Sequence, residues 1–409
     1  MLLFENKEQK LLNLLRFTGS PFKKFVSTGE IEEDIGLVHS RQDFIQNIIN
    51  ITEKEENFIL PIIGDVGTGK THLYWALKHE LYYYNIVYIS LENVIKKFYN
   101  NTYAEFIENM GIEVLRNIAR RLCNEWGALE RKFGFFHIGD IEKVKNKAFE
   151  KWAQKFENKK AITDIITAIT THQLDPYKKM DVERWFLGEV IDIRDLSRLN
   201  LKHDLRERNN SYTMLKVLVE NAMVNSVLFI DDFEKIVSMI SPIQIEEEGE
   251  EEEEVFDRSW LYGTRQSPDK RRAEKILDKI LKLTKIDGLR IIITLKSMEF
   301  YKEIISEIER KNSNLLNLVK KPIVLSNFVE EDLFQFYKKN LEFFFAHINS
   351  LDYNKDFSDS LYPLNENILK SIFNQTKGNP REIIKFLIKI FNDILLSYED
   401  LEDILKNYE

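Results

Sequence analysis

The chain has 409 residues, of which 44% are hydrophobic and 31% charged, as in a soluble globular protein with one main domain and a smaller companion. Its formal net charge is −9, but eight glutamates between positions 246 and 254 account for all but −1 of this charge. The bulk charge therefore neither predicts nor excludes a nucleic-acid partner. The single cysteine, Cys123, excludes an internal disulfide framework and a multi-cysteine zinc site. No apolar run approaches the length of a membrane span, so we expect a cytoplasmic protein without a membrane contact.

The first segment, residues 1–35, predicts one short helix followed by a polar connector that contains Ser20 and Pro21. Residues 37–49 read LVHSRQDFIQNII, and the isoleucines and phenylalanine after position 43 recur at helical spacing. Ser40 is the expected N-cap of this helix, with Asp43 three residues further on.

The strongest motif follows an apolar run at residues 58–63, which has the length and β-branched content of a buried strand. Residues 64–71 read GDVGTGKT and match the pattern G-x-x-x-x-G-K-[ST] at every fixed position. Leu73, Ala76 and Leu77 then recur at helical spacing, so the motif lies between a strand and a helix. This is the context that a phosphate-binding loop, or P-loop, requires.

The residue types in this motif fit a nucleoside triphosphate. Glycines let the backbone turn tightly and bring its N–H groups close to phosphate oxygens, and the helix that follows offers its positive end to the same anion. Lys70 is expected to reach the β- and γ-phosphates, and the Thr71 hydroxyl to bind Mg²⁺. We therefore expect ATP and Mg²⁺ as cofactors, and the predicted contacts with the nucleotide are Gly64, Asp65, Val66, Gly67, Thr68, Gly69, Lys70, Thr71 and His72.

A second strand is predicted at residues 86–90, and no convincing strand follows between about 93 and 222. Helices are predicted there at about 103–125, 141–157, 160–172, 180–198 and 211–224. One interpretation is a plain helical subdomain. The other is an insert that binds a partner or DNA, because five cations gather near its end, although acids are interleaved with them. These cations are Arg194, Arg198, Lys202, Arg206 and Arg208.

A third strand at residues 227–230 ends in two carboxylates. Ligands bind at the carboxyl ends of strands in open parallel sheets. Asp231 is the expected Mg²⁺ ligand, and Asp232 is placed where a second carboxylate orients or deprotonates the attacking water.

In the rest of the chain, predicted helices and strands alternate, and the last part is predicted to be helical. An acidic loop at 245–256 is followed by a helix at 269–285, a strand at 290–294, a helix at 298–309 and a short strand at 322–325. Three apolar stripes predict helices in the last 80 residues, and Asn379 and Pro380 open the third of these helices. The predicted domains are an N-terminal helix and connector (1–35), an ATPase core (36–325) and a helical lid (326–409).

With these elements the chain resembles the AAA+ ATPases and the related STAND NTPases, most of all the branch of origin-recognition and archaeal initiator-like ATPases. The resemblance rests on GDVGTGKT (64–71), LFIDDFE (228–234), IIITLKS (291–297), GNPRE (378–382) and LVHSRQDFIQNII (37–49). It implies an α/β fold with a five-stranded parallel sheet of the ASCE/AAA+-like P-loop NTPase type, here with a long helical insertion and a C-terminal helical lid.

The resemblance also implies roles for single residues. Thr294 or Lys296 would be the first sensor of the γ-phosphate, and Arg381 the second sensor, carried on the lid. The segment with Arg41 resembles the motif that packs beside the adenine. Arg310 is the candidate for an arginine finger acting on a neighbouring subunit, with Arg271 and Arg272 as rivals.

Three departures from the family pattern affect the functional prediction. Asp232 stands where most AAA+ members carry Glu, the insertion is longer than in a minimal module, and the sequence ends at Glu409 without the winged helix of initiator relatives. We predict an ATPase, a homo-oligomer or a subunit of a larger complex, that drives assembly or remodelling in DNA processing or antiviral defence. The alternative is a slow STAND-like switch that binds a protein partner. A nucleotide kinase is disfavoured by the paired acids and the lid.

Overall fold

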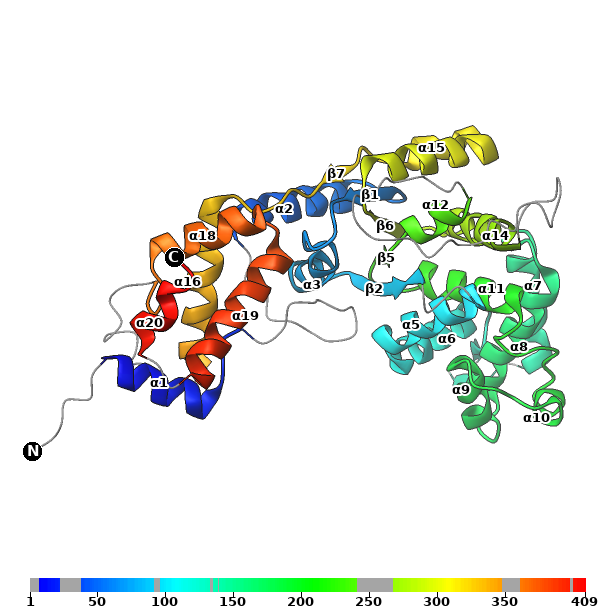
Figure 1. The fold of residues 1–409 in the computed structure, drawn as a ribbon. Helices are drawn as coiled ribbons and strands as arrows, with labels where there is room; N and C mark the ends of the chain where they lie inside the picture. Colours follow the sequence, from blue (N-terminus) through cyan, green and yellow to red (C-terminus); the bar gives the residue numbers. More distant parts are fainter. Residues whose placement is uncertain are drawn as a thin grey trace, which may run out of the picture. The chain divides into compact units, whose positions relative to one another are not determined.

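A computed structural model describes residues 7–22, 38–91, 96–132, 135–138, 140–240, 268–347, 361–397 and 400–409 (Figure 1). The fold is α/β, and its main sheet has five strands in the order β2-β5-β6-β1-β7. Strand β1 pairs with β7, β2 with β5 and β5 with β6, each in parallel, which confirms the predicted five-stranded parallel sheet. The strands are β1 (Ile59–Ile63), β2 (Asn85–Ser90), β5 (Ser226–Asp231), β6 (Leu289–Leu295) and β7 (Ile323–Val324). The predicted acidic loop at 245–256 lies outside the described residues.

The central strands are continuous apolar runs because both faces of the sheet are covered. Every residue of β1, β5 and β6 is buried. The register between β2 and β5 runs from Asn85 opposite Ser226 to Ser90 opposite Asp231, so both strands end at the same level. Asp231 is consequently the last residue of a fully buried strand, at the carboxyl edge of the sheet.

The chain divides into two compact units. Unit 1 comprises residues 1–53, 62–80 and 322–409, and unit 2 comprises residues 54–61 and 81–321. The P-loop and the C-terminal helices belong to unit 1, whereas β5, β6 and the helical insertion belong to unit 2.

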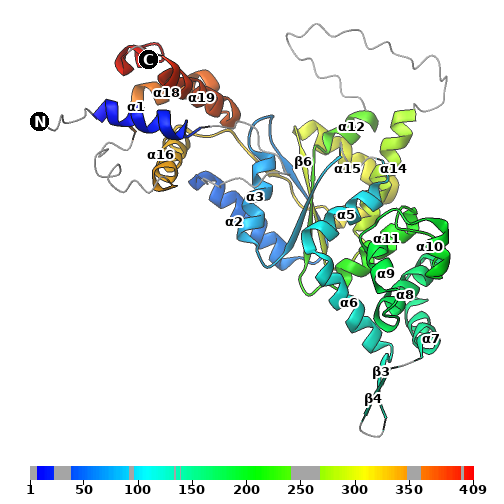
Figure 2. The same ribbon diagram turned by 90° about the horizontal axis from the view of Figure 1, so that it is seen from below.

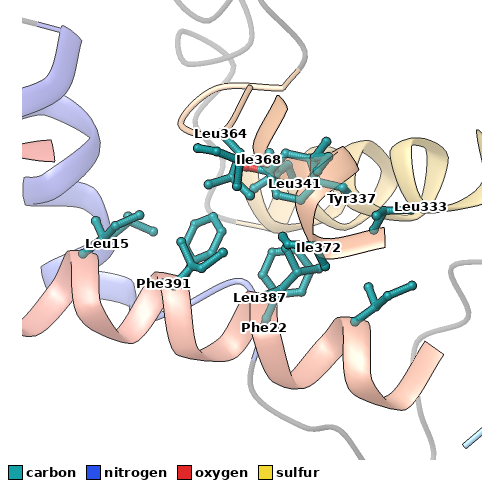
Figure 3. Close-up of a cluster of buried hydrophobic side chains, with 14 of the residues drawn as sticks. Leu15, Phe22, Leu333, Tyr337, Leu341, Leu364, Ile368, Ile372, Leu387 and Phe391 are labelled. Atoms are coloured by element: carbon teal, nitrogen blue, oxygen red, sulfur yellow. The ribbon is translucent and has the colours of Figure 1, made fainter. Parts of the chain in front are cut away.

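Unit 1 has a core formed by both ends of the chain. Phe22 stacks on Tyr337 with ring centroids 5.9 Å apart and lies 5.2 Å from the Phe391 ring, within a cluster of buried aliphatic side chains (Figure 3). Leu15 of α1 joins the same cluster. The helices of this unit are α1 (Lys7–Thr18), α2 (His39–Lys54), α3 (Lys70–Glu80), α16 (Glu330–His347), α18 (Glu366–Thr376), α19 (Pro380–Leu396) and α20 (Leu401–Lys406).

Unit 2 contains the predicted helical insertion, which is confirmed. Its helices are α5 (Phe98–Met110), α6 (Ile112–Glu125), α7 (Ile141–Trp152), α8 (Lys159–Leu174), α9 (Lys179–Phe186), α10 (Ile193–Arg198) and α11 (Arg208–Glu220). The predicted helix at 103–125 is two helices, because Gly111 has φ 78° and ends the first of them. The remaining helices of unit 2 are α12 (Glu234–Ile240), α14 (Pro268–Leu283), α15 (Met298–Asn312) and the 3-10 helix η1 (Ser313–Leu318).

The prediction of an insertion without strands is wrong at one place. Strands β3 (Leu129–Lys132) and β4 (Phe135–Ile138) form an antiparallel hairpin, drawn beyond the end of α6 in Figure 2. Each strand has four residues, too few for an alternating pattern to stand out from the helical periodicity on either side.

Candidate functional site

The P-loop joins β1 to α3 as the sequence predicts. Gly67 and Gly69 have φ values of 88° and 98°, which explains why glycine is needed at both positions. Helix α3 begins at Lys70, and the Leu73 N–H donates to the Gly69 carbonyl over 3.1 Å. The Thr68 hydroxyl closes the turn by donating to the Asp65 carbonyl (2.9 Å). The loop therefore has the tight backbone and the helix start that a phosphate cradle requires.

The Lys70 side chain lies along the loop from which it starts. Its ammonium donates to the carbonyls of Gly64 (2.5 Å) and Asp65 (3.1 Å). A Cβ at Gly69 would meet no atom within 4 Å, so there is open space beside this end of the loop. A half-buried lysine at the start of a helix next to an open glycine fits an anion with several oxygens. Thr71 and His72 follow in the first turn of α3, both half-buried.

Helix α2 begins one residue earlier than Ser40, so the prediction that Ser40 caps it is wrong. The helix spans His39–Lys54, and the Ser40 hydroxyl donates to Asp332 Oδ2 (2.8 Å). The partner lies 292 positions away in the sequence, in the first turn of α16. A tertiary hydrogen bond has replaced the local cap that the sequence pattern predicted.

Arg41 is brought to the P-loop by α2. Its Nη2 donates to the carbonyls of Ser326 (2.6 Å) and Thr68 (3.3 Å), and its guanidinium lies 5.1 Å from the Phe328 ring centroid. Burial lowers the Arg41 pKa to about 10, and the charge of Asp332 opposes this shift. Nη1 is buried and has no hydrogen-bond partner in the described part of the chain. Because an unsatisfied buried donor costs about 1–3 kcal/mol, this nitrogen fits a ligand that supplies an acceptor.

The first turn of α19 is tied to the tip of the P-loop. The Asn379 Oδ1 caps the helix by accepting from the N–H groups of Arg381 and Glu382, as the sequence predicts. Its Nδ2 donates to the Val66 carbonyl (2.9 Å), and the Arg381 N–H also donates to the Gly67 carbonyl (3.2 Å). A Cβ on Gly67 would lie 2.5 Å from Asn379 Oδ1, so glycine is needed there for close approach as well. Asn379 is a site residue that the sequence identified only as a cap.

We predict that Asn379→Asp weakens ATP binding about 10-fold while α19 stays folded. Aspartate caps a helix as well as asparagine does, but it cannot donate to the Val66 carbonyl and places a negative charge beside it. Nucleotide affinity and hydrogen exchange of the α19 first turn would measure the two effects separately.

Asn365→Asp is the matched control, because the Asn365 side chain also caps a helix, α18, and its Nδ2 contacts Glu409 instead of the P-loop. Equal losses of ATP affinity in both variants would contradict a specific role of the Asn379 contact.

The two acids of β5 occupy different environments within unit 2. Asp231 is 4% exposed, and its carboxylate accepts from the Thr294 hydroxyl (2.5 Å) and the Tyr88 hydroxyl (3.0 Å). Asp232 has φ 56°, a left-handed conformation that Asp tolerates better than most residues. The Asp232 N–H donates to Thr294 Oγ1 (3.1 Å), and its half-exposed carboxylate pairs with Lys235 (3.3 Å). Asp231 is thus held by neighbouring strands, whereas Asp232 faces solvent.

Of the two candidates for the first sensor, Thr294 is fully buried and hydrogen-bonded to Asp231. In this arrangement it orients the Asp231 carboxylate. Lys296 is half-buried, just beyond the end of β6. Tyr88 was missed by the sequence analysis, since its role depends on β2 being the neighbour of β5.

The arginine candidates lie on three helices. Arg310 of α15 is exposed and pairs with Glu307 (2.6 Å) and Glu274 (3.4 Å). Arg271 and Arg272 are exposed in the first turns of α14, and Arg272 pairs with Asp269 (3.4 Å). Arg381 is half-buried at the start of α19. The described residues contain no group of three or more His, Cys, Asp or Glu side chains that could hold a metal ion.

Comparisons with known proteins identify no family for this chain. No protein-family model matches it, and no curated protein matches it. Among solved structures, it is similar to a Walker-type ATPase of Pyrococcus abyssi, with 13% sequence identity and a TM-score of 0.39. The alignment covers 93% of this chain and 72% of that one. No described helix is long and apolar enough to cross a membrane.

Proposed function

We propose that this protein is an ATPase that binds ATP together with Mg²⁺ and hydrolyses it. The observation that carries the proposal is the complete GxxxxGKT loop between β1 and α3, with its two left-handed glycines and Lys70 at the helix start. The sheet order adds support, since β6 separates the P-loop strand from the strand with the acids, as in ASCE-type ATPases. The buried carboxylate of Asp231 is a further point in its favour.

The residues present fit the two cofactors. Backbone N–H groups of residues 64–71 and the Lys70 ammonium would bind the phosphates, and Arg41 Nη1 would meet an acceptor of the nucleotide. Thr71 and Asp231 would hold Mg²⁺, which neutralises charge on the phosphate oxygens when bound. Asp232 would orient the attacking water, because it is the more exposed of the two acids. The roles of Arg381 as second sensor and Arg310 as finger remain parts of the proposal.

The alternative is a slow nucleotide switch, and the Asp232–Lys235 ion pair favours it. The Lys235 ammonium lies 3.3 Å from the Asp232 carboxylate, and this pair must reorganise before Asp232 can act on water. The contact of Asn379 with the P-loop would let the C-terminal helices respond to the nucleotide in either case. Turnover rate is what separates the two functions.

One experiment tests the proposal and its alternative. We expect the purified chain to release phosphate from ATP in the presence of Mg²⁺ and not in the presence of EDTA. The native mass of the chain is measured with ATP and, separately, with ADP. Assembly that depends on ATP supports an oligomeric ATPase, and slow turnover by a monomer supports the switch. Absence of both ATP binding and phosphate release would contradict the proposal.

We further propose that the ATPase works in the cytoplasm as a homo-oligomer or as a subunit of a DNA-processing or antiviral-defence complex. The support for this setting is the resemblance to initiator-like ATPases and the long helical insertion.

A further inference from the structure

The basic residues singled out near the end of the insertion are partly neutralised. Arg198 pairs with Asp181 (2.7 Å) and Asp195 (3.3 Å), and Arg206 pairs with Asp204 (2.6 Å). A phosphate backbone would have to compete with these carboxylates. Arg198 and Arg206 are therefore poor contacts for a nucleic acid, although their residue type suggested such a role.

Cations without a counter-ion gather instead on α14 and at the start of α11. Arg208, Lys275 and Lys279 make no ion pair with any residue in the described ranges. Both Arg208 and Lys279 lie beside the Tyr99 ring, 5.9 and 6.0 Å from its centroid. Burial lowers the Lys279 pKa, and the charges of Arg208 and Lys275 lower it further. Three cations that make no ion pair with a described residue thus lie close together here, which favours an anion site.

Two of the three acids of α14 pair with cations of another helix, and the third, Asp269, pairs with Arg272 of α14 itself (3.4 Å). Asp278 pairs with Lys311 (2.7 Å) and Glu274 with Arg310 (3.4 Å), both on α15. The apolar residues of α14, from Ala273 to Leu281, are buried in the core. Glu274 and Asp278 thus face α15, whereas Arg271 and Lys275 are exposed on an outer face of the helix.

The cations form a row along this outer face. Positions 271, 275, 279 and 282 follow one another at intervals of four, four and three residues, which puts them on one side of a helix. Neighbours four residues apart are about 6 Å apart along the axis. We call Arg271, Lys275, Lys279, Lys282 and Arg208 the α14 basic row. Lys282, at the end of the row, pairs with Glu157 (3.0 Å). One of these cations is enough to bind a single phosphate ion, whereas a linear polyanion can contact all the cations of the row.

The row is held by hydrogen bonds from two other helices. The Tyr99 hydroxyl of α5 donates to the Lys279 carbonyl (3.2 Å), and the Tyr212 hydroxyl of α11 donates to the Lys282 carbonyl (3.3 Å). Figure 2 shows α5, α11 and α14 side by side in unit 2. Since Tyr99 is 3% exposed, its ring is not available for stacking on a base. Binding to single strands usually relies on such stacking, so a duplex contacted through its phosphates fits better.

We propose that the α14 basic row binds the phosphate backbone of duplex DNA without reading its sequence. This inference deepens the proposed role in DNA processing and rests on it for the choice of partner. All residues of the row belong to unit 2, and in the sequence they are far from the P-loop.

The test uses the full chain and a short DNA duplex at two salt concentrations. We expect Lys275→Gln with Lys279→Gln to weaken binding at least about 10-fold at low salt, and to reduce the slope of log K against log salt by about 1.8, because two phosphate contacts are lost. The matched control, Arg198→Gln with Arg206→Gln, removes the same charge from cations that are already paired. It should change affinity and slope little.

Several outcomes would overturn the inference: no binding by the unmodified chain, equal losses in both double variants, or competition by polyglutamate as effective as competition by DNA. The last result would mean that the row binds acidic protein. Phosphate release from ATP is measured on the same preparations, so that ATP hydrolysis and DNA binding by the row are tested separately. A chain that binds duplex through the row but hydrolyses no ATP would contradict the proposed enzyme and leave the row intact.

Discussion

Lys70→Ala is expected to reduce ATP affinity at least about 100-fold, because hydrogen bonds to charged groups contribute about 1.5–3 kcal/mol each and this lysine would make them to two phosphates. The ammonium now rests on the carbonyls of Gly64 and Asp65, 2.5 and 3.1 Å away, so it must turn from the loop to the nucleotide. The loop backbone keeps its glycines in the variant. Isothermal titration with ATP, together with phosphate release, measures the effect.

Lys78→Ala is the matched control for this variant. Lys78 lies on the same helix, two turns further along, where its ammonium is 5.0 Å from the Trp75 ring centroid. The substitution removes the same side chain and leaves the P-loop unchanged, so ATP affinity should stay within about twofold of the original. If the two variants lose affinity equally, Lys70 has no special role, and the assignment of the P-loop as the nucleotide site is wrong.

The parts of the fold that the sequence predicted best are those that depend on local pattern. The apolar runs before Gly64 and before Asp231 are strands because continuous hydrophobicity suits a sheet covered on both faces. The P-loop follows from its glycines, whose left-handed φ values at Gly67 and Gly69 no other residue type adopts as easily. The cap at Asn379 likewise depends only on its own helix.

The contacts that the sequence missed join residues far apart in the chain. Tyr88 reaches Asp231 because β2 and β5 are adjacent, although 143 positions separate the two residues. Ser40 bonds to Asp332, and Asn379 to Val66, across still longer separations. Each of these side chains has a plausible local role, so a local pattern could not reveal the tertiary one. The β3–β4 hairpin was missed for a different reason, its short strands.

The positioning of the two acids explains why they should respond differently to substitution. Asp231 accepts hydrogen bonds from Thr294 and Tyr88 in a buried setting, and any change there disturbs three strands at once. Asp232 touches the same Thr294 only through its backbone N–H, and its side chain is left to Lys235 and solvent. A substitution of Asp232 is therefore expected to change ATP turnover without changing the stability of the fold.

We predict that Asp232→Asn lowers ATP turnover about 100-fold or more and leaves ATP affinity nearly unchanged. Asparagine tolerates the left-handed backbone at φ 56° as well as aspartate does, so the turn and the Asp231 carboxylate keep their geometry. The amide cannot take a proton from water, and general-base catalysis contributes about 10²–10⁴-fold to such reactions. Single-turnover phosphate release and a separate binding titration measure the two quantities.

Lys235→Met distinguishes catalysis from a merely electrostatic effect of Asp232. It removes the ion pair that Asp232 makes at 3.3 Å and keeps the carboxylate. If Asp232 is the base, freeing it from the lysine should raise turnover or leave it unchanged, whereas Asp232→Asn lowers it. If Lys235→Met and Asp232→Asn, each made alone, reduce turnover equally, then the ion pair itself is required. Asp232 would then no longer be the residue that acts on water.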